Sequence, residues 1–300
     1  MILASKTAQA IEDAMQHDQG ARFRMFLGQT MPQAGDAYAP THTDWRNHLG
    51  ASLIGRECTR ELWYSFRWAT LKRFDGRMLR LFNRGHLEEA RFVALLLMID
   101  CPVWQLDENG KQFRVMGHRG HFGGSLDGVT RGLPDLPDEA VLTEFKTHND
   151  KSFAKLVAEG VMAAKWEHFV QMQIYMGKHQ LRWALYGAVN KNDDNLHLEL
   201  IQFDSTIYER YLVKSVLVID AIEPPPRISK SPGFFKCKFC DHQQVCHLGV
   251  HPERHCRTCT YAQLQDAGQW NCLLTASRLS PEKQREGCEK YKLDPVFTIK

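Results

Sequence analysis

The sequence predicts an α/β protein followed by a cysteine-rich module, and three observations carry that prediction. Apolar residues at helical spacing alternate with short apolar runs between turn residues, giving the order helix, strands, helix, strands, helix over residues 52–222. Three consecutive prolines at 224–226 end this pattern. After them Cys and His become frequent, which indicates a module boundary.

Composition sets the class of protein. With 300 residues, 43% hydrophobic and 24% charged, the chain can form one sizeable core plus an appendage. The net charge of +3 permits an anionic partner without requiring one. No apolar run approaches the roughly 18 residues of a membrane span, and acidic residues interrupt any secretory signal, so we expect a cytoplasmic protein of a bacterium or phage-infected host. The segment "YMGKHQ" lacks the flanking residues of a P-loop, which argues against an ATP-driven motor.

The expected elements follow in chain order. Residues 1–45 are polar and rich in Gly, Pro and Ala after a short helix, and we interpret them as an N-terminal extension. A helix near Gly160 should be interrupted, because glycine disfavours the helical interior. The remaining expectations are helices within 52–69, 77–100, 151–179 and 205–222, and strands within 111–129, 140–148, 182–191 and 197–204.

Three charged residues in the central hairpin suggest chemistry. Glu144 and Lys146 are two apart in the strand "VLTEFKT", so they share a face, while Phe145 points to the core. Asp127, on the preceding strand, should face them. Two carboxylates can bind a hard divalent cation such as Mg²⁺ or Mn²⁺, and a lysine can position water or stabilise charge on phosphate. The structural alternative is an ion pair on an exposed strand.

An ordered set of residues extends this constellation. His86, Asp127, Glu144-x-Lys146 and Gln171-xxx-Tyr175 resemble the PD-(D/E)XK nucleases, and within them the RecB-like exonucleases, which include the AddB nuclease domain, the CRISPR-adaptation nucleases and phage recombination exonucleases. The resemblance covers about residues 50–250. The sequence has "SLDGV" where the family name expects Pro-Asp, a departure that the RecB-like branch shares.

The resemblance implies a fold and residue roles. Residues 46–226 would form a restriction-endonuclease-like core, a central mixed sheet flanked by helices. His86, Asp127, Glu144 and the Phe145 carbonyl would hold the catalytic Mg²⁺ or Mn²⁺, and Lys146 would serve the attacking water. Gln171 and Tyr175 would contact DNA or brace the site. Glu89 shares the helix face of His86 and is either a further site residue or a solvated carboxylate.

A first cysteine set is "CKFCDHQQVC". Cys237, Cys240 and Cys246 are one thiolate short of a tetrahedral site, and Cys58 is available far upstream. This arrangement resembles the [4Fe–4S] staple of AddB and the CRISPR-adaptation nucleases, which would tie residues 227–250 to Cys58. Zinc at the same thiolates is the alternative metal, and a buried apolar thiol is the alternative role of Cys58.

A second set occupies residues 251–300. Cys256, Cys259, Cys272 and Cys288 are typical of a structural zinc site, because a short polar module needs a metal to fold. Three histidines are alternative ligands, namely His247, His251 and His255. Cys101 has no partner at ligand spacing and is expected in the core.

These patterns favour a metal-dependent DNA exonuclease of recombination, repair or DNA degradation, acting on DNA ends that carry a single-stranded region. A recombinase, single-strand-binding protein or helicase could assist it, and no membrane partner is expected. The alternatives are a structure-specific or single-strand endonuclease on the same core, and a catalytically silent DNA-binding protein with structural metal centres. A redox sensor would leave the His-Asp-Glu-Lys set unexplained.

Overall fold

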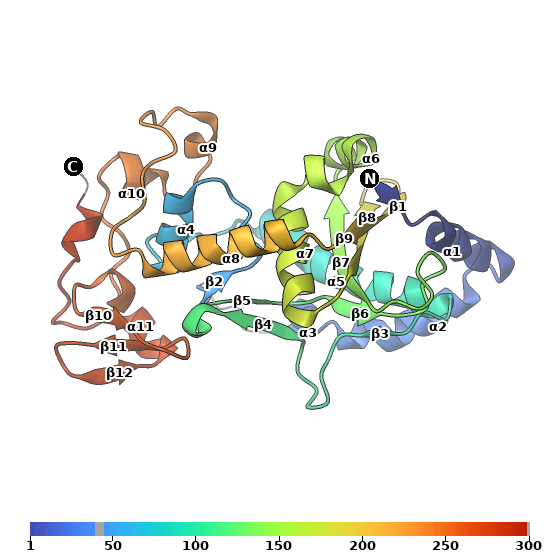
Figure 1. Cartoon of the computed structure of the whole chain (residues 1–300), viewed down its shortest axis with the longest axis horizontal. Helices are drawn as coiled ribbons and strands as arrows, with labels where there is room; N and C mark the ends of the chain where they lie inside the picture. Colours follow the sequence, from blue (N-terminus) through green and yellow to red (C-terminus); the bar gives the residue numbers. More distant parts are fainter. Residues whose placement is uncertain (40–44, 299–300) are drawn as a thin grey trace. The chain divides into compact units, whose positions relative to one another are not determined.

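The computed structural model describes residues 1–39 and 45–298, and the chain divides into two compact units (Figure 1). Unit 1 comprises Met1–His42, Phe74–Val115 and Ser125–Tyr208, and unit 2 comprises Thr43–Arg73, Met116–Gly124 and Glu209–Lys300. The end of the expected extension, positions 40–44, lies outside the described residues. Within the described ranges, no helix combines the length and apolar character needed to cross a bilayer.

Unit 1 is built on a six-stranded mixed sheet with the order β1-β9-β8-β7-β6-β3. Strands β7 and β8 run parallel, and all the other neighbours are antiparallel. The predicted α/β class with a central mixed sheet flanked by helices is confirmed. The strands are β1 (Ile2–Leu3), β3 (Val103–Trp104), β6 (Gly128–Thr130), β7 (Val141–His148), β8 (Trp183–Asn190) and β9 (Leu196–Gln202).

Helices cover both faces of this sheet. Helices α1 and α5 pack on one face, where Ile11 and Phe92 join Phe145 in the hydrophobic core, and α2 packs against α5. Helices α6 and α7 contact β7 and β8 on the other face (Figure 1). The helices are α1 (Ser5–His17), α2 (Ala21–Thr30), the 3₁₀ turn η1 (Met31–Gln33), α3 (Gly35–Tyr38), α5 (Gly76–Met98), α6 (Asp150–Ala164) and α7 (Trp166–His179).

Local sequence explains where these helices begin and bend. The Asp75 carboxylate accepts the Met78 N–H at 2.7 Å and so caps α5, which confirms the long helix predicted over 77–100. The predicted interruption also occurs: Gly160 has a φ of 76°, a left-handed conformation that favours glycine, and α6 kinks there. The next helix, α7, starts after Lys165.

The N-terminal residues contribute to unit 1. Strand β1 pairs with β9 at the edge of the sheet, and Ala4 and Ile11 lie in the hydrophobic core. Asp135 accepts hydrogen bonds from the Thr7 N–H and hydroxyl, both at 2.7 Å. Residues 1–38, part of the expected extension, therefore complete the sheet and its core.

Unit 2 consists mostly of short elements, and β4, β5 and α8 lie partly in the residue ranges of unit 1. It has two three-stranded sheets, with the orders β2-β5-β4 and β10-β11-β12. The helix expected within 52–69 is shorter, Thr59–Phe66, because tight turns occupy the residues before Cys58. The elements are β2 (Leu49–Gly50), α4 (Thr59–Phe66), β4 (Arg114–Gly117), η2 (His118–Gly120), β5 (Phe122–Ser125), α8 (Ser205–Asp220), α9 (Phe235–Lys238), α10 (Gln243–His247), η3 (Cys256–Thr258), β10 (Ala262–Leu264), β11 (Trp270–Cys272), β12 (Ser277–Leu279), α11 (Pro281–Glu286) and η4 (Pro295–Phe297).

A buried arginine organises the core of unit 2. The Arg257 guanidinium lies 3.6 Å from the ring centroid of Trp68 and donates to the carbonyls of Phe66 and Asn47, both at 2.9 Å. Its Nε donates to Gln284 Oε1 at 2.8 Å. The described contacts of the Arg257 side chain include no carboxylate. Its buried charge is instead stabilised by stacking on Trp68 and by three hydrogen bonds.

Candidate active site

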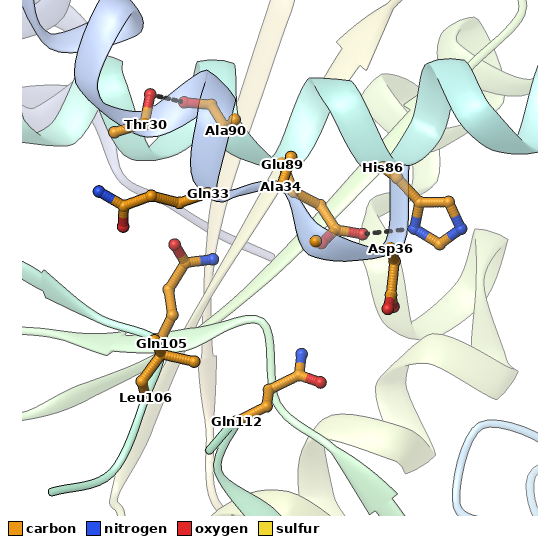
Figure 2. A pocket seen from close by; sticks show the side chains of 11 residues that line it. Thr30, Gln33, Ala34, Asp36, His86, Glu89, Ala90, Gln105, Leu106 and Gln112 are labelled. Carbon is orange, nitrogen blue, oxygen red and sulfur yellow. Dashed lines mark hydrogen bonds and ion pairs between the residues drawn. The ribbon is translucent and has the colours of Figure 1, made fainter. Parts of the chain in front are cut away.

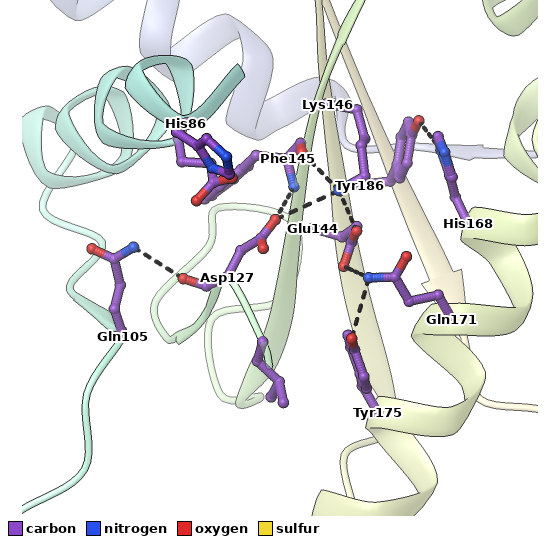
Figure 3. Close-up of polar contacts among 12 residues, drawn as sticks. His86, Gln105, Asp127, Glu144, Phe145, Lys146, His168, Gln171, Tyr175 and Tyr186 are labelled. Carbon is purple, nitrogen blue, oxygen red and sulfur yellow. Dashed lines mark hydrogen bonds and ion pairs between the residues drawn. The ribbon is translucent and has the colours of Figure 1, made fainter. Parts of the chain in front are cut away.

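The hairpin of β6 and β7 brings Asp127 and Glu144 together, as predicted (Figure 3). Gly128 pairs with Thr143, so the next position along places Asp127 opposite Glu144. Asp127 lies one residue before β6, outside any strand, and its Oδ2 accepts the Phe145 N–H at 2.8 Å. The sheet register and this hydrogen bond together fix the position of the Asp127 carboxylate.

Lys146 lies among three oxygen-bearing groups. Its Nζ forms an ion pair with Glu144 Oε1, donates to the Phe145 carbonyl at 3.0 Å, and lies 3.9 Å from Asp127 Oδ2. Two carboxylates and one main-chain carbonyl thus converge on a single cationic group. The alternative of an exposed ion pair on the strand is excluded, because Glu144 is fully buried.

Burial and like charge dominate the electrostatics of this cluster. Burial and the neighbouring Glu144 raise the pKa of Asp127 well above its usual range, and burial also raises the pKa of Glu144. Burial alone would lower the pKa of Lys146, but the two carboxylates raise it above its ordinary value. Lys146 is therefore an ammonium at neutral pH, and it lies beside two buried carboxyl groups whose ionisation is disfavoured by burial.

Helix α7 supports the cluster from one side of the sheet. Gln171 Nε2 donates to Glu144 Oε2 at 3.1 Å and to the Tyr175 hydroxyl at 3.4 Å (Figure 3). The four-residue spacing of Gln171 and Tyr175 places both on the helix face toward β7, as the sequence indicated. Burial raises the pKa of Tyr175, so its hydroxyl stays protonated.

A polar network that the sequence analysis missed adjoins the cluster. Tyr186 on β8 pairs in register with Glu144, and its hydroxyl contacts His168 Nδ1 at 2.8 Å and His148 Nε2 at 3.0 Å. Burial lowers the pKa of His148 to about 4 and that of His168 to about 3. The sequence could have indicated this network through His168, which lies three residues before Gln171 and therefore on the same helix face.

The structure does not pair His86 with Asp127 or Glu144. His86 lies on α5, which packs on the sheet face opposite α7, and its Nδ1 is 3.8 Å from Glu89 Oε1. The neighbouring Glu89 carboxylate raises the pKa of His86, and Asp127 contributes to the same shift. Glu89 is thus the partner of His86 rather than an isolated solvated carboxylate.

A cavity of about 210 Å³ opens beside this histidine (Figure 2). His86, Glu89 and Asp36 contribute charged or titratable groups to its lining, and Gln105 and Gln112 contribute amides. Gln105 donates to the Asp127 carbonyl at 3.1 Å and Gln112 to the Leu126 carbonyl at 3.0 Å. These amides brace the turn that carries Asp127, a role that no sequence pattern indicated.

The first cysteine set gathers around one cavity in unit 2. Cys58, Cys237, Cys240 and Cys246 all line it. Cys58 caps α4, where its Sγ accepts the Glu61 N–H at 3.4 Å. Burial and the neighbouring thiols raise the pKa of Cys237, and burial raises that of Cys240 to about 12. Cys58 therefore lies near Cys237, Cys240 and Cys246 although it is far from them in the sequence.

The second cysteine set is also close in space. Burial, followed by the charges of Cys259, Cys288 and Cys272, raises the pKa of Cys256 to about 11. His255 is not available as a replacement ligand: its Nε2 donates to the Trp68 carbonyl at 2.8 Å and its Nδ1 accepts the Arg257 N–H at 3.2 Å.

Cys101 is buried and contacts the Gly132 carbonyl at 3.2 Å, in agreement with the predicted core role.

No group of three or more His, Cys, Asp or Glu side chains within residues 1–39 and 45–298 is arranged so that it could hold a metal ion. The Asp127 and Glu144 carboxylates and the Phe145 carbonyl all lie near Lys146 Nζ, but this set contains only two side chains of those four types. Iron–sulfur and zinc sites at the cysteines therefore remain predictions.

Comparisons with known proteins give only distant similarities. No family model matches the chain, and no curated protein matches it. The alkaline exonuclease LHK-Exo from Laribacter hongkongensis, solved alone and in complex with dAMP, is 17% identical with a TM-score of 0.43, covering 58% of this chain and 86% of its own. The structure of SSO0001 is 14% identical with a TM-score of 0.38, covering 76% of this chain and 97% of its own. Similarities this low do not establish a family.

Proposed function

We propose that this chain is a metal-dependent DNA exonuclease of the PD-(D/E)XK type, which hydrolyses phosphodiester bonds from DNA ends. The observation that supports the proposal is the convergence of the Asp127 and Glu144 carboxylates and the Phe145 carbonyl on one cationic group, the Lys146 ammonium. Hard oxygen donors of this kind suit Mg²⁺ or Mn²⁺.

The donor set fits a divalent cation on electrostatic grounds. Burial, and for Asp127 also the neighbouring Glu144, raises the pKa values of both carboxyl groups, and a divalent cation beside them would favour their ionised forms. Asp127, Glu144 and the Phe145 carbonyl would hold the cation, with His86 as a fourth ligand after its ring leaves Glu89. When bound, the cation would lower the pKa of a coordinated water and neutralise charge on the phosphate.

The residues of the chain would then perform the remaining tasks. Lys146, kept protonated by its two carboxylates, would orient the attacking water and stabilise charge on the phosphate rather than accept a proton. The water would lose a proton to solvent as its oxygen forms a bond to phosphorus, the P–O bond to the leaving sugar oxygen would break, and that oxygen would take up a proton from solvent. Gln171 would hold Glu144 in place through its hydrogen bond.

The deciding experiment compares four substrates: end-labelled linear and covalently closed circular DNA, each single- and double-stranded, with Mg²⁺ or Mn²⁺. The wild-type protein is compared with Lys146→Ala and with the control Lys155→Ala, an exposed lysine of α6. We expect loss of linear DNA from its ends, intact circles, and a decrease of about 100- to 1,000-fold for Lys146→Ala only.

Other results would select the alternatives. Cleavage of circles would replace the exonuclease by an endonuclease on the same site. Binding of DNA without any cleavage, in protein whose metal content has been verified, would indicate a catalytically silent DNA-binding protein.

We further propose that Cys58, Cys237, Cys240 and Cys246 hold a [4Fe–4S] cluster, with zinc as the alternative. The support is that all four line one cavity and that burial, followed by the charges of Cys58 and Cys246, raises the pKa of Cys237; a bound cation would oppose the effect of those charges. Anaerobic purification, a visible absorption spectrum and metal analysis test the proposal. A colourless protein that contains zinc and no iron would exclude the cluster.

For the second set, we propose structural zinc at Cys256, Cys259, Cys272 and Cys288. The support is that, after burial, the charges of Cys259, Cys288 and Cys272 contribute to raising the pKa of Cys256, as expected for thiols that lie close together. One equivalent of zinc should be lost in Cys259→Ser, whereas Cys101→Ser should retain it.

A further inference from the structure

Unit 2 exposes three phenylalanines within a short segment. Phe234, Phe235 and Phe239 have 41%, 72% and 70% of their surface exposed, whereas Phe66 and Phe297 of the same unit are buried. Exposed phenylalanine forgoes the hydrophobic stabilisation that burial gives, so a cluster of them indicates a contact surface rather than a contribution to folding.

Local hydrogen bonds hold this segment in a defined shape. The Lys238 N–H donates to the Phe234 carbonyl at 2.8 Å, and the Cys240 N–H donates to the Cys237 carbonyl at 3.1 Å. The resulting turn of α9 brings the rings of Phe235 and Phe239 to a centroid distance of 5.5 Å at an interplanar angle of 69°. The two rings therefore meet nearly edge to face, and both side chains remain largely exposed.

The charge around the rings is positive. Residues 227–239 contain four basic residues and no acidic one. Arg227 is used internally, since it donates to the Cys246 carbonyl, and Lys236 forms an ion pair with Glu57. Lys230 and Lys238 are exposed, and neither forms an ion pair within the described part of the chain; Lys238 Nζ lies 5.7 Å from the Phe239 ring centroid.

We propose that Phe234, Phe235, Phe239, Lys230 and Lys238, termed the aromatic–lysine surface, bind single-stranded nucleic acid by stacking unpaired bases and contacting phosphates. The inference rests on the proposed function, since it assigns that enzyme a second contact with its substrate. Aromatic faces beside lysines bind single strands without sequence preference.

Chemistry favours a single strand over the other anionic partners. Bases of a duplex are stacked inside it and cannot lie against a protein ring, whereas unpaired bases offer both faces. A membrane-binding element would place its apolar residues along a long amphipathic helix, but α9 contains only four residues.

The test measures binding without hydrolysis. In the Lys146→Ala background, fluorescence anisotropy of labelled oligo(dT) of about 16 nucleotides gives Kd for the parent and for Phe235→Ala/Phe239→Ala. We expect the double variant to raise Kd at least about tenfold. The Lys230→Ala/Lys238→Ala variant should reduce the slope of log Kd against log salt by about 1.4.

Two controls separate stacking from other effects. Leu217→Ala, which truncates an exposed apolar residue of α8, should leave Kd unchanged. Phe235→Leu/Phe239→Leu retains apolar surface without rings and should still weaken binding; if it binds like the parent, stacking is wrong. Circular dichroism melting checks that every variant folds.

The remaining outcomes are also informative. An unchanged Kd in the double alanine variant overturns the proposal, and phenylalanine-dependent binding to vesicles of anionic lipid, but not to oligo(dT), replaces it with a membrane surface. Binding that depends on the rings in a protein that never cleaves DNA would uphold the aromatic–lysine surface while rejecting the nuclease.

Discussion

The Asp127 carboxylate is held by the main chain of Phe145, whose N–H donates to Asp127 Oδ2 at 2.8 Å. The residue before β6 is thereby attached to the strand that carries Glu144, and the two carboxylates are close before any cation binds. Because the two carboxylates are already close, little of the free energy of metal binding is lost in bringing them together.

A first prediction concerns metal binding, read out as stability. Mn²⁺ at about 100 times its Kd should raise the free energy of unfolding by about 2.7 kcal/mol, because the cation binds the folded state only. Asp127→Asn and Glu144→Gln should abolish this increase. Thermal denaturation with and without Mn²⁺ measures it.

The control for this prediction is Glu159→Gln, which removes an exposed carboxylate of α6 that pairs with Lys155. It should keep the full stabilisation by Mn²⁺. If Asp127→Asn and Glu144→Gln also keep it, the cation binds elsewhere in the chain.

Two buried glutamines of α7 offer a matched comparison. Gln171 donates to Glu144, whereas Gln173 donates to the Gln202 carbonyl at 3.0 Å and accepts the Asp204 N–H at 2.7 Å. Each alanine variant should lose about 1–3 kcal/mol of stability, because a buried partner is left unpaired. Only Gln171→Ala should also lose nuclease activity.

Urea denaturation and the end-label assay, applied to both variants, separate the two effects. Equal loss of activity in Gln173→Ala would show that Gln171 acts through general stability. Full activity in Gln171→Ala would remove its role in holding Glu144.

Packing behind the site is tested at Gly187 on β8. A Cβ there would lie 3.0 Å from Phe145 Cδ1 and 3.1 Å from Phe92 Cε1, two rings that stack with centroids 4.8 Å apart. Gly187→Ala should cost about 1–3 kcal/mol and reduce activity by displacing Phe145. Gly28→Ala in α2, where nothing lies within 4 Å, should instead stabilise by about 0.5–1 kcal/mol. A neutral Gly187→Ala would show that the rings move apart freely.

Acid should destabilise the protein through its buried histidines. The pKa of His148 is about 4 in the folded protein, below the value of about 6.5 expected when unfolded. The unfolded state therefore binds more protons between these values, and stability falls as pH decreases from about 6.5 to about 4. His148→Gln should weaken this dependence, as measured by melting temperature against pH. Substitution of the exposed His17 by Gln should leave the dependence unchanged; an equal effect at both positions would contradict the assignment.

Short-range patterns made most of unit 1 predictable. The alternation of Glu144, Phe145 and Lys146 gave the correct faces of β7, and the turn-rich loop before it gave the hairpin with Asp127. The four-residue spacing of Gln171 and Tyr175 likewise gave the face of α7 toward Glu144.

Features that depend on tertiary packing could not be predicted. Helical spacing placed Glu89 on the same face of α5 as His86 but does not say which sheet face that helix covers, and so it was not foreseen that His86 pairs with Glu89 rather than with Asp127 or Glu144. Gln105 and Gln112 contact main-chain carbonyls, which leave no side-chain pattern in a sequence. The two interleaved units depend on contacts between distant segments, and the composition change after residues 224–226 falls inside unit 2 rather than at its boundary.

The interleaving of the two units has a consequence for biosynthesis. All segments of unit 1 have been translated once residue 208 is made, whereas unit 2 also needs residues 209–300. During synthesis, the apolar side chains in the early segments of unit 2 therefore stay unburied until the last segment of this unit has been made. A nascent-chain chaperone should therefore bind residues 45–73 longest, and truncation within 209–300 should leave unit 1 ordered and residues 45–73 exposed.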